Sequence, residues 1–196
     1  MSTVLTIGHS SQTVEEFVRL LVAQGVEVLV DVRSSPYSGY VPQFDRELLQ
    51  ASLSSTGVRY LFLGAELGGR PKQDSYYDEK GRAVYGRMTK DPAFLSGIER
   101  LERGIASYRV ALMCGEEDPA SCHRRLLVGR VLVERGHELK HIRGDGRLQP
   151  DAEVADESGR ELVSSQPALF AEMDEDQWRS TASVSPKKTP LNSSAR

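Results

Sequence analysis

Apolar and polar positions along this chain follow two periods, one typical of buried strands and one typical of helices. Residues 26–32 read Val-Glu-Val-Leu-Val-Asp-Val, a nearly continuous apolar run of the kind found in central parallel strands. Shorter apolar runs at residues 4–7, 59–63, 110–113 and 139–142 predict four further strands.

Helix signals lie between these predicted strands. A capping box at residues 13–16 predicts the start of a first helix. Asp45 is a suitable N-cap and predicts the start of a second helix. Asp91-Pro92 and Asp118-Pro119 predict two more, since aspartate is a good N-cap and proline is tolerated at the first helical position. The alternation predicts an α/β fold with a mainly parallel sheet of about five strands, flanked by helices in three layers.

The chain has 196 residues, enough for one domain and a tail. We expect residues 1–150 to form a single α/β domain, in which the polar, tyrosine-rich residues 71–90 form a lid or a flexible insertion. Residues 151–179 are acidic and predict an extension with one helix near residues 167–178. Residues 180–196 are rich in Ser, Thr, Pro and Lys, which predicts a disordered tail.

The formal net charge is −3, which argues against a broad nucleic-acid-binding surface but not against a local basic pocket. No apolar run approaches the length of a membrane span, and the N-terminal residues lack the pattern of a secretory signal. Two cysteines in a chain of this size suggest a reducing compartment. We therefore expect a cytoplasmic protein, and leave its oligomeric state open.

Polar residues follow three of the predicted strands at the point where each strand ends. His9 and Ser10 follow the first, Asp31 and Arg33 lie at the end of the second, and the strand at residues 110–113 leads into a third group. The ends of parallel strands meet at one edge of a sheet, where open α/β folds bind ligands. The third group consists of Cys114 and Glu116, followed at the next helix start by Cys122, His123 and Arg124.

These residue types suggest an anion-binding enzyme. Arg33 and Arg124 would grip a phosphate or carboxylate, with help from Ser10, Asp31 and a helix N-terminus. The alternative is that Arg33 and Arg124 are buried structural residues paired with Asp31 or Glu116. Asp31 would orient Arg33 or His9 rather than attack a substrate.

The predicted catalytic residues are His9, Glu116, Cys122 and His123. His9 or His123 would move protons, and Glu116 would position a water or a ribose hydroxyl. His9 is equally a strand-end histidine bonded to the backbone. Cys122 is placed for a lowered pKa at a helix start, and would be a nucleophile, a ligand or a packing residue.

A metal site is a further alternative, although no metal ligand is assigned. Cys114, Cys122 and His123, joined by His9 from another strand, would supply four ligands for zinc or iron, but the Cys-x7-Cys-His spacing is not a standard one. Cys114 is equally a small buried hydrophobic residue at the end of an apolar strand.

Five segments of the sequence together resemble the bacterial and archaeal domain of unknown function 488 family over residues 3 to 145. They are Thr6-Ile7-Gly8-His9-Ser10; Asp31-Val32-Arg33 with Pro36 and Ser38; Leu67-Gly68-Gly69; Met113-Cys114-Gly115-Glu116 with Asp118-Pro119 and Cys122-His123-Arg124; and His141-Ile142. The resemblance implies an α/β fold and a shared polar site, and it names no reaction. The shared site would comprise His9, Ser10, Asp31, Arg33, Glu116, Cys122, His123 and Arg124.

Residues 29–33 are also similar to the Asp-x-Arg strand of rhodanese-like sulfurtransferases, so the architecture is expected to be Rossmann-like or rhodanese-like. In the rhodanese active-site loop an arginine follows the nucleophilic cysteine by six residues. Here that position is Ala120, and Arg124 follows Cys114 by ten, so this loop is absent.

The sequence therefore favours a cytoplasmic enzyme that acts on a nucleotide-like or phosphate-ester substrate by group transfer or hydrolysis. A cysteine-dependent sulfur or redox enzyme and a metal-dependent enzyme are alternatives. A non-catalytic module that binds a nucleotide or nucleic acid is another. The cofactor is not predicted.

Overall fold

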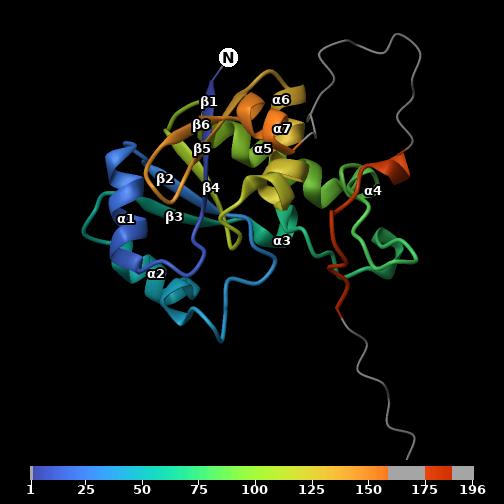
Figure 1. The fold of residues 1–196 in the computed structure, drawn as a ribbon, viewed down its shortest axis with the longest axis horizontal. Coiled ribbons are helices and arrows are strands. Elements are labelled where there is room, and N and C mark those ends of the chain that lie inside the picture. The colour runs from blue at the N-terminus through green and yellow to red at the C-terminus, as the bar shows by residue number, and fades with distance from the viewer. Residues whose placement is uncertain (1, 159–174, 187–196) are drawn as a thin grey trace, which may run out of the picture.

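The computed structural model describes residues 2–158 and 175–186, and within them the fold is α/β (Figure 1). A mainly parallel sheet carries six strands in the order β3-β2-β4-β1-β5-β6. The strands are β1 (Thr3–Gly8), β2 (Val28–Asp31), β3 (Arg59–Phe62), β4 (Val110–Cys114), β5 (Glu138–Ile142) and β6 (Leu148–Pro150).

The fold class is confirmed, with one strand more than the predicted number of about five. The additional strand, β6, has three residues including a proline, and it pairs antiparallel with β5. So short a segment shows no alternation of its own, and it lies on the edge of the sheet, where proline is tolerated. The order also differs from that of the dinucleotide-binding Rossmann fold, because β4 lies between β2 and β1.

Helices cover both faces of the sheet (Figure 1). Alternate residues of a strand point to opposite faces, and in β2 Leu29 belongs to one apolar core while Val28 and Val30 belong to the other. The core around Leu29 is shared with α1 (Val14–Ala23) and α2 (Arg46–Leu53). The opposite core is shared with α5 (Pro92–Ile105) and with the helix that follows β4, which confirms three layers.

Several short helices complete the chain. They are α3 (Gly64–Leu67), α4 (Tyr85–Met88), α6 (Arg130–Glu134), α7 (Asp151–Ser158), the 3-10 turns η1 (Pro42–Phe44), η2 (Asp74–Tyr76), η3 (Pro119–Ser121) and η5 (Glu175–Gln177), and the π-helical segment η4 (Arg124–Gly129). None of the helices within the described ranges is long and apolar enough to cross a membrane.

The helix predicted from Asp118 is divided into three parts. The side chain of Asp118 accepts a hydrogen bond from the amide of Ala120, at 3.0 Å, but the turn that it caps is the short η3. Cys122 then has an extended backbone, and a helix resumes through η4 into α6. Cys122 and His123 therefore do lie at a helix start, as predicted, although one turn later than the N-cap.

The C-terminal residues that the structure describes pack on the domain. The Asp151 carboxylate contacts Arg125 and His141, so α7 extends the domain beyond the predicted boundary at residue 150. Ser180 is 4% exposed and its amide donates to the carbonyl of Ala83 at 2.8 Å. Residues 180–186, expected to begin a disordered tail, are thus held by backbone bonds, which composition does not reveal. Most of the helix predicted at residues 167–178 lies outside the described residues.

Candidate functional site

The predicted polar strand ends lie together at the carboxyl edge of the sheet. The amide of His9, after β1, donates to the carbonyl of Cys114 at 3.0 Å. The amide of Val32, after β2, donates to the carbonyl of Met113 at 3.1 Å. Because β4 lies between β1 and β2, the residues after all three strands share one edge.

Asp31 and Arg33 form a buried ion pair within this group. Nη2 of Arg33 lies 2.7 Å from Oδ2 of Asp31, and it also donates to the carbonyl of Phe44 at 2.8 Å. The hydroxyl of Tyr60 donates to the same Oδ2, at 2.7 Å. The Arg33 guanidinium therefore binds groups of the protein itself. This is the structural role given above as the alternative to substrate binding.

His9 is held beside this ion pair. Its ring stacks on Phe44, with centroids 4.3 Å apart, and Nδ1 lies 2.8 Å from the carbonyl oxygen of Ser10. A carbonyl accepts, so Nδ1 carries the proton, and Nε2 accepts from Nη1 of Arg33 at 3.2 Å. Burial lowers the pKa of His9, which favours the neutral ring. Both nitrogens therefore have protein partners.

Ser10 is exposed and has a φ of 49°, the one positive φ of a non-glycine residue in the described ranges. Its amide donates to the carbonyl of Gly115 at 2.8 Å. This bond ties the turn after β1 to the turn after β4. A serine kept in the left-handed region costs energy and is often found at functional sites.

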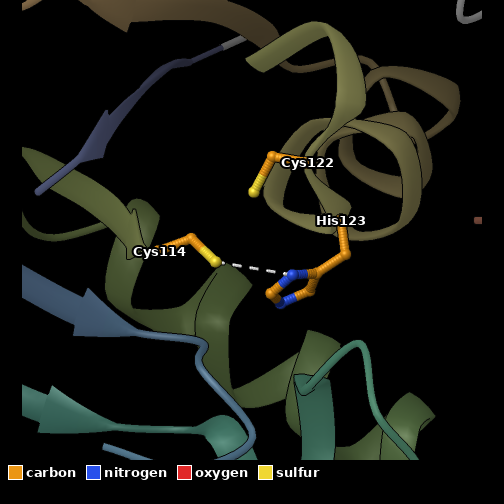
Figure 2. Close-up of side chains that lie close together, drawn as sticks. All are labelled: Cys114, Cys122 and His123. Carbon is orange, nitrogen blue, oxygen red and sulfur yellow. Dashed lines mark hydrogen bonds between the residues drawn. The ribbon is translucent and has the colours of Figure 1, made fainter. Parts of the chain in front are cut away.

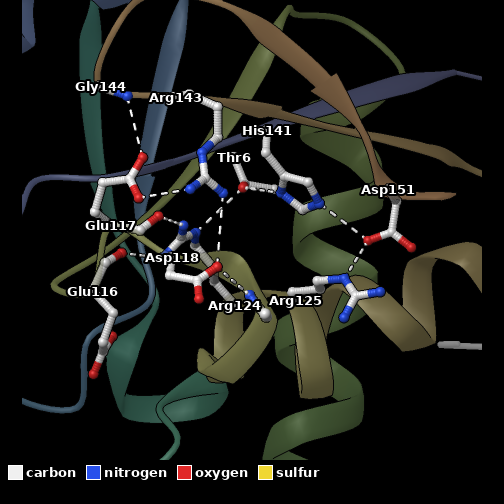
Figure 3. Close-up of polar contacts among 11 residues, drawn as sticks. Thr6, Glu116, Glu117, Asp118, Arg124, Arg125, His141, Arg143, Gly144 and Asp151 are labelled. Atoms are coloured by element: carbon white, nitrogen blue, oxygen red, sulfur yellow. Dashed lines mark hydrogen bonds and ion pairs between the residues drawn. The ribbon is translucent and has the colours of Figure 1, made fainter. Parts of the chain in front are cut away.

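Arg124 is completely buried, in contrast to its predicted role as a substrate-binding residue (Figure 3). Nη1 donates to the carbonyl of Glu116, Nη2 to the carbonyl of Glu117 at 2.6 Å, and Nε to Oγ1 of Thr6 at 3.3 Å. The guanidinium thus holds the loop after β4 against β1. It contacts the backbone of Glu116 rather than the carboxylate that the sequence suggested as its partner.

Cys114, Cys122 and His123 point toward one another from the end of β4 and from the following helix start (Figure 2). Their two Sγ atoms and one imidazole nitrogen all lie within 4.8 Å of one another. Nδ1 of His123 is 3.5 Å from Sγ of Cys114, and Nε2 is 2.8 Å from the carbonyl oxygen of Val32. Both cysteines are buried and neither is in a disulfide.

Glu116 joins this cluster from its exposed side. Its Oε2 accepts hydrogen bonds from Sγ of Cys114, at 3.0 Å, and from Sγ of Cys122, at 3.1 Å. Burial opposes ionisation of the carboxyl, but these bonds lower the pKa of Glu116 to about 2. The carboxylate is therefore ionised at neutral pH and faces both sulfurs.

The two cysteines differ in acidity. A hydrogen bond to Cys122 and burial raise the pKa of Cys114. Burial also disfavours the Cys122 thiolate, but the hydrogen bond from Cys114 and the positive charges of Arg124 and His123 lower the pKa of Cys122 to about 5. Burial opposes protonation of His123, yet the contact with Cys122 raises its pKa. The cluster can therefore hold an anionic sulfur beside a cation.

Within residues 2–158 and 175–186, Cys114, Cys122 and His123 form the group able to hold a metal. Two sulfurs and an imidazole nitrogen are ligands that zinc prefers. His9, suggested as a fourth ligand, has its ring nitrogens on Ser10 and Arg33 and is not part of the cluster.

A pocket of about 560 Å³ opens beside the cluster, after β2 and β3. Three cations, Arg46, Arg70 and Lys72, are among its lining residues, with Ser34, Ser35 and Phe62. None of the eight predicted site residues lines it. No pattern in the sequence pointed to these cations, because Arg70 and Lys72 come from a loop and Arg46 from the exposed end of a helix.

Gly68 and Gly69 form the wall between the pocket and the cluster. Gly68 lines the pocket. A Cβ atom on Gly69 would lie 2.6 Å from Cγ of His123, so only glycine lets the backbone approach the ring. Gly69 therefore packs directly on His123, and Gly68 packs on Ser34.

A second polar network lies behind Arg124 (Figure 3). Oδ1 of Asp151 accepts from Nε of Arg125 at 2.6 Å and lies 3.0 Å from Nε2 of His141. Nδ1 of His141 is 2.7 Å from Oγ1 of Thr6. The sequence analysis predicted no site role for Arg125 or Asp151. The one residue of this network that it noted is His141, in the last of the five segments that resemble the family.

Comparison with protein families gives one match. The model of the domain of unknown function DUF488 matches residues 13–131, a range that includes Asp31, Arg33 and the segment from Cys114 to Arg124. No curated protein matches the chain. No solved structure matches it either. Since the family model covers more than half of the sequence, the chain belongs to the DUF488 family.

Proposed function

We propose that this DUF488 protein is a cytoplasmic enzyme that binds a small anionic substrate in the pocket after β2 and β3. The substrate class is a nucleotide or another phosphate ester, and the reaction is group transfer or hydrolysis. The observation that carries the proposal is a group of three pocket cations, Arg46, Arg70 and Lys72.

The state of these cations supports an anionic ligand. Among the described residues, none of the three is in an ion pair, whereas Arg33 and Arg124 are fully used inside the protein. Arg46 lies over the ring of Phe62, with 5.4 Å from Cζ to the ring centroid, and its charge stays accessible. Glu66 and Asp91 also line the pocket, so its net formal charge is +1.

Size and position support the same ligand class. A volume of about 560 Å³ is within the usual range of roughly 300–1,000 Å³ for small-molecule sites. Ala93, in the first turn of α5, lines the pocket, so the positive end of that helix adds to the attraction for an anion. The carboxyl edge of a parallel sheet is also the usual place for ligands in α/β folds.

The Cys-His cluster supplies groups that can do chemistry next to this pocket. His123 packs on the back of Gly69, and Gly68 lines the pocket. The two ring nitrogens of His123 lie against Cys114 and the carbonyl of Val32, so Glu116, at the exposed rim of the cluster, is the candidate residue to take up a proton or position a water.

Ligand-induced thermal stabilisation tests this proposal. The probes are AMP, ADP, ATP, pyrophosphate and a sugar phosphate, with adenosine as the uncharged comparison. A ligand at 100 times its dissociation constant should add about 2.7 kcal/mol to the free energy of unfolding.

The variant Arg70→Ala/Lys72→Ala should lose most of that stabilisation. Arg103→Ala is the control, because Arg103 is an exposed cation near the opposite end of α5 and does not line the pocket. Stabilisation by adenosine alone, or equal loss in the control and pocket variants, would refute an anion site here.

A further inference from the structure

We propose that Cys114, Cys122 and His123 bind one zinc ion, with three protein ligands and one position left for an exogenous ligand. This inference concerns the cluster and not the adjoining pocket, so it does not depend on the proposed substrate.

The spacing of the donor atoms fits a tetrahedral metal. With zinc–sulfur and zinc–nitrogen distances of about 2.3 and 2.05 Å, a tetrahedral angle puts the sulfur and nitrogen about 3.6 Å apart. The observed separation between Sγ of Cys114 and Nδ1 of His123 is 3.5 Å. The third donor, Sγ of Cys122, lies within 4.8 Å of both, so a shift of a few tenths of an ångström to about one ångström completes the geometry.

His123 is held in the orientation that a metal ligand needs. Its Nε2 lies 2.8 Å from the carbonyl oxygen of Val32, so this nitrogen carries a proton and donates. In the neutral ring Nδ1 is then left with a lone pair, and that atom faces the two sulfurs (Figure 2). Ligating histidines typically donate their second nitrogen to a backbone carbonyl or a carboxylate in this way.

A carboxylate oxygen and two sulfurs also lie close together in the cluster. Oε2 of the Glu116 carboxylate lies 3.0 Å from Sγ of Cys114 and 3.1 Å from Sγ of Cys122. The neighbouring arginines do not contact these atoms directly, since Arg33 binds Asp31 and Arg124 binds the backbone carbonyls of residues 116 and 117. A divalent cation between the sulfurs would neutralise thiolates that otherwise need protons.

The two cysteine ligands are buried, and His123 is half-buried. Cys114 is the last residue of β4, and Cys122 and His123 connect η3 to η4. The backbone of Gly69 packs against the His123 ring. Two thiolates and an imidazole favour zinc over harder cations such as Mg²⁺ and Ca²⁺.

Three protein ligands leave one tetrahedral position open, as in catalytic zinc sites, where it holds water or substrate. Glu116 contacts both sulfurs from the exposed rim, which places a carboxylate where it can accept a proton from a bound water. We assign Glu116 to this supporting role rather than to a ligand.

The test is metal content per chain in full-length protein purified without an affinity tag and without chelator. We expect close to one zinc per chain. After removal of the metal under reducing conditions, Co²⁺ should bind at one equivalent and give the charge-transfer absorption of thiolate–cobalt bonds.

Cys114→Ser, Cys122→Ser and His123→Ala should each weaken metal binding by roughly 100-fold or more, because few ligands share the binding free energy of such a site. His137→Ala is the control histidine and should bind normally. Glu116→Gln should retain one metal per chain. Circular dichroism checks that each variant is folded, and the Co²⁺ titration of the wild-type chain decides the question if a variant is not.

Three results would overturn the inference. They are a reduced wild-type chain that binds neither Zn²⁺ nor Co²⁺, a chain purified with a Cys114–Cys122 disulfide and no metal, and Co²⁺ absorption that survives both cysteine replacements. The variant Arg70→Ala/Lys72→Ala should keep its metal, so failure of the anion pocket and failure of the zinc site are separate outcomes.

Discussion

Asp31 and Arg33 form an ion pair that is almost completely removed from solvent, with exposed side-chain fractions of 0% and 8%. The two residues are separated by only Val32: Asp31 is the last residue of β2, and Arg33 lies just after the strand. The pair supports His9 through Nη1 of Arg33, so the charge of Arg33 is part of the architecture of the sheet edge.

Asp31→Ala should destabilise the protein strongly. Removing one partner of a buried pair leaves the other charge uncompensated, at a cost of about 3–5 kcal/mol. Urea denaturation followed by circular dichroism measures the change. Glu16→Ala, which breaks an exposed pair with Arg19, is the matched control and should cost less than about 1 kcal/mol. Equal effects of the two replacements would contradict a buried structural pair.

Arg124→Met should act on folding rather than on ligand affinity. The replacement leaves the carbonyls of Glu116 and Glu117 without their donors, and each unsatisfied buried group costs about 1–3 kcal/mol. We expect a loss of several kcal/mol in the free energy of unfolding, while the folded fraction binds anionic probes normally. A stable variant that no longer binds anions would instead return Arg124 to the substrate site.

The His141–Asp151 pair predicts loss of stability in acid. Burial lowers the pKa of His141, and hydrogen bonds from His141 and Arg125 lower that of Asp151 although burial opposes this. Both groups bind protons more weakly in the folded protein, so their contributions are complete above the unfolded pKa values and disappear as the pH falls. The contribution of His141 to stability is lost as the pH falls below about 6.5, and that of Asp151 as the pH falls below about 4.

The measurement for this pair is the free energy of unfolding between pH 8 and pH 4. Asp151→Asn should lower stability at pH 7 and flatten the acid part of the profile. Equal acid slopes for the wild type and Asp151→Asn would refute the contribution of this pair.

Trp178 should stabilise the domain although it belongs to the C-terminal segment. Its Nε1 donates to the carbonyl of Leu126 at 2.7 Å, and its ring lies under Arg130, 4.2 Å from Cζ. Trp178→Ala should cost about 2 kcal/mol from the lost hydrogen bond and packing. Arg179→Ala is the neighbouring control, and its exposed side chain should contribute little. If both variants match the wild type in thermal melts, residues 175–186 do not support the domain.

The convergence of His9, Arg33, Cys114 and His123 could be predicted from sequence because it follows from one rule. Parallel strands end at one edge, and β1, β2 and β4 each end in polar residues. The apolar runs located the strands, and helix caps such as Thr13 and Asp91 located the helix starts.

The roles of individual side chains could not be predicted in the same way. Whether Arg33 and Arg124 face a ligand or the interior depends on which acceptors lie near them. Several of these acceptors are backbone carbonyls in loops, such as those of Phe44 and Glu117, and a side-chain pattern does not show where a carbonyl points. The pocket cations and the segment around Ser180 have no periodic pattern, because loops are positioned by tertiary contacts.

In the π-helical segment Arg124–Gly129, the number of residues matters more than which residues they are. A π-helical turn holds one residue more than an α-helical turn, and one residue corresponds to about 100° of rotation along a helix. Deleting a single residue here would rotate Cys122 and His123 away from Cys114 while leaving α6 seated on its core. Among homologous chains that keep the Cys-His pair, we therefore expect substitutions in this segment to be accepted and single-residue insertions or deletions to be eliminated by selection.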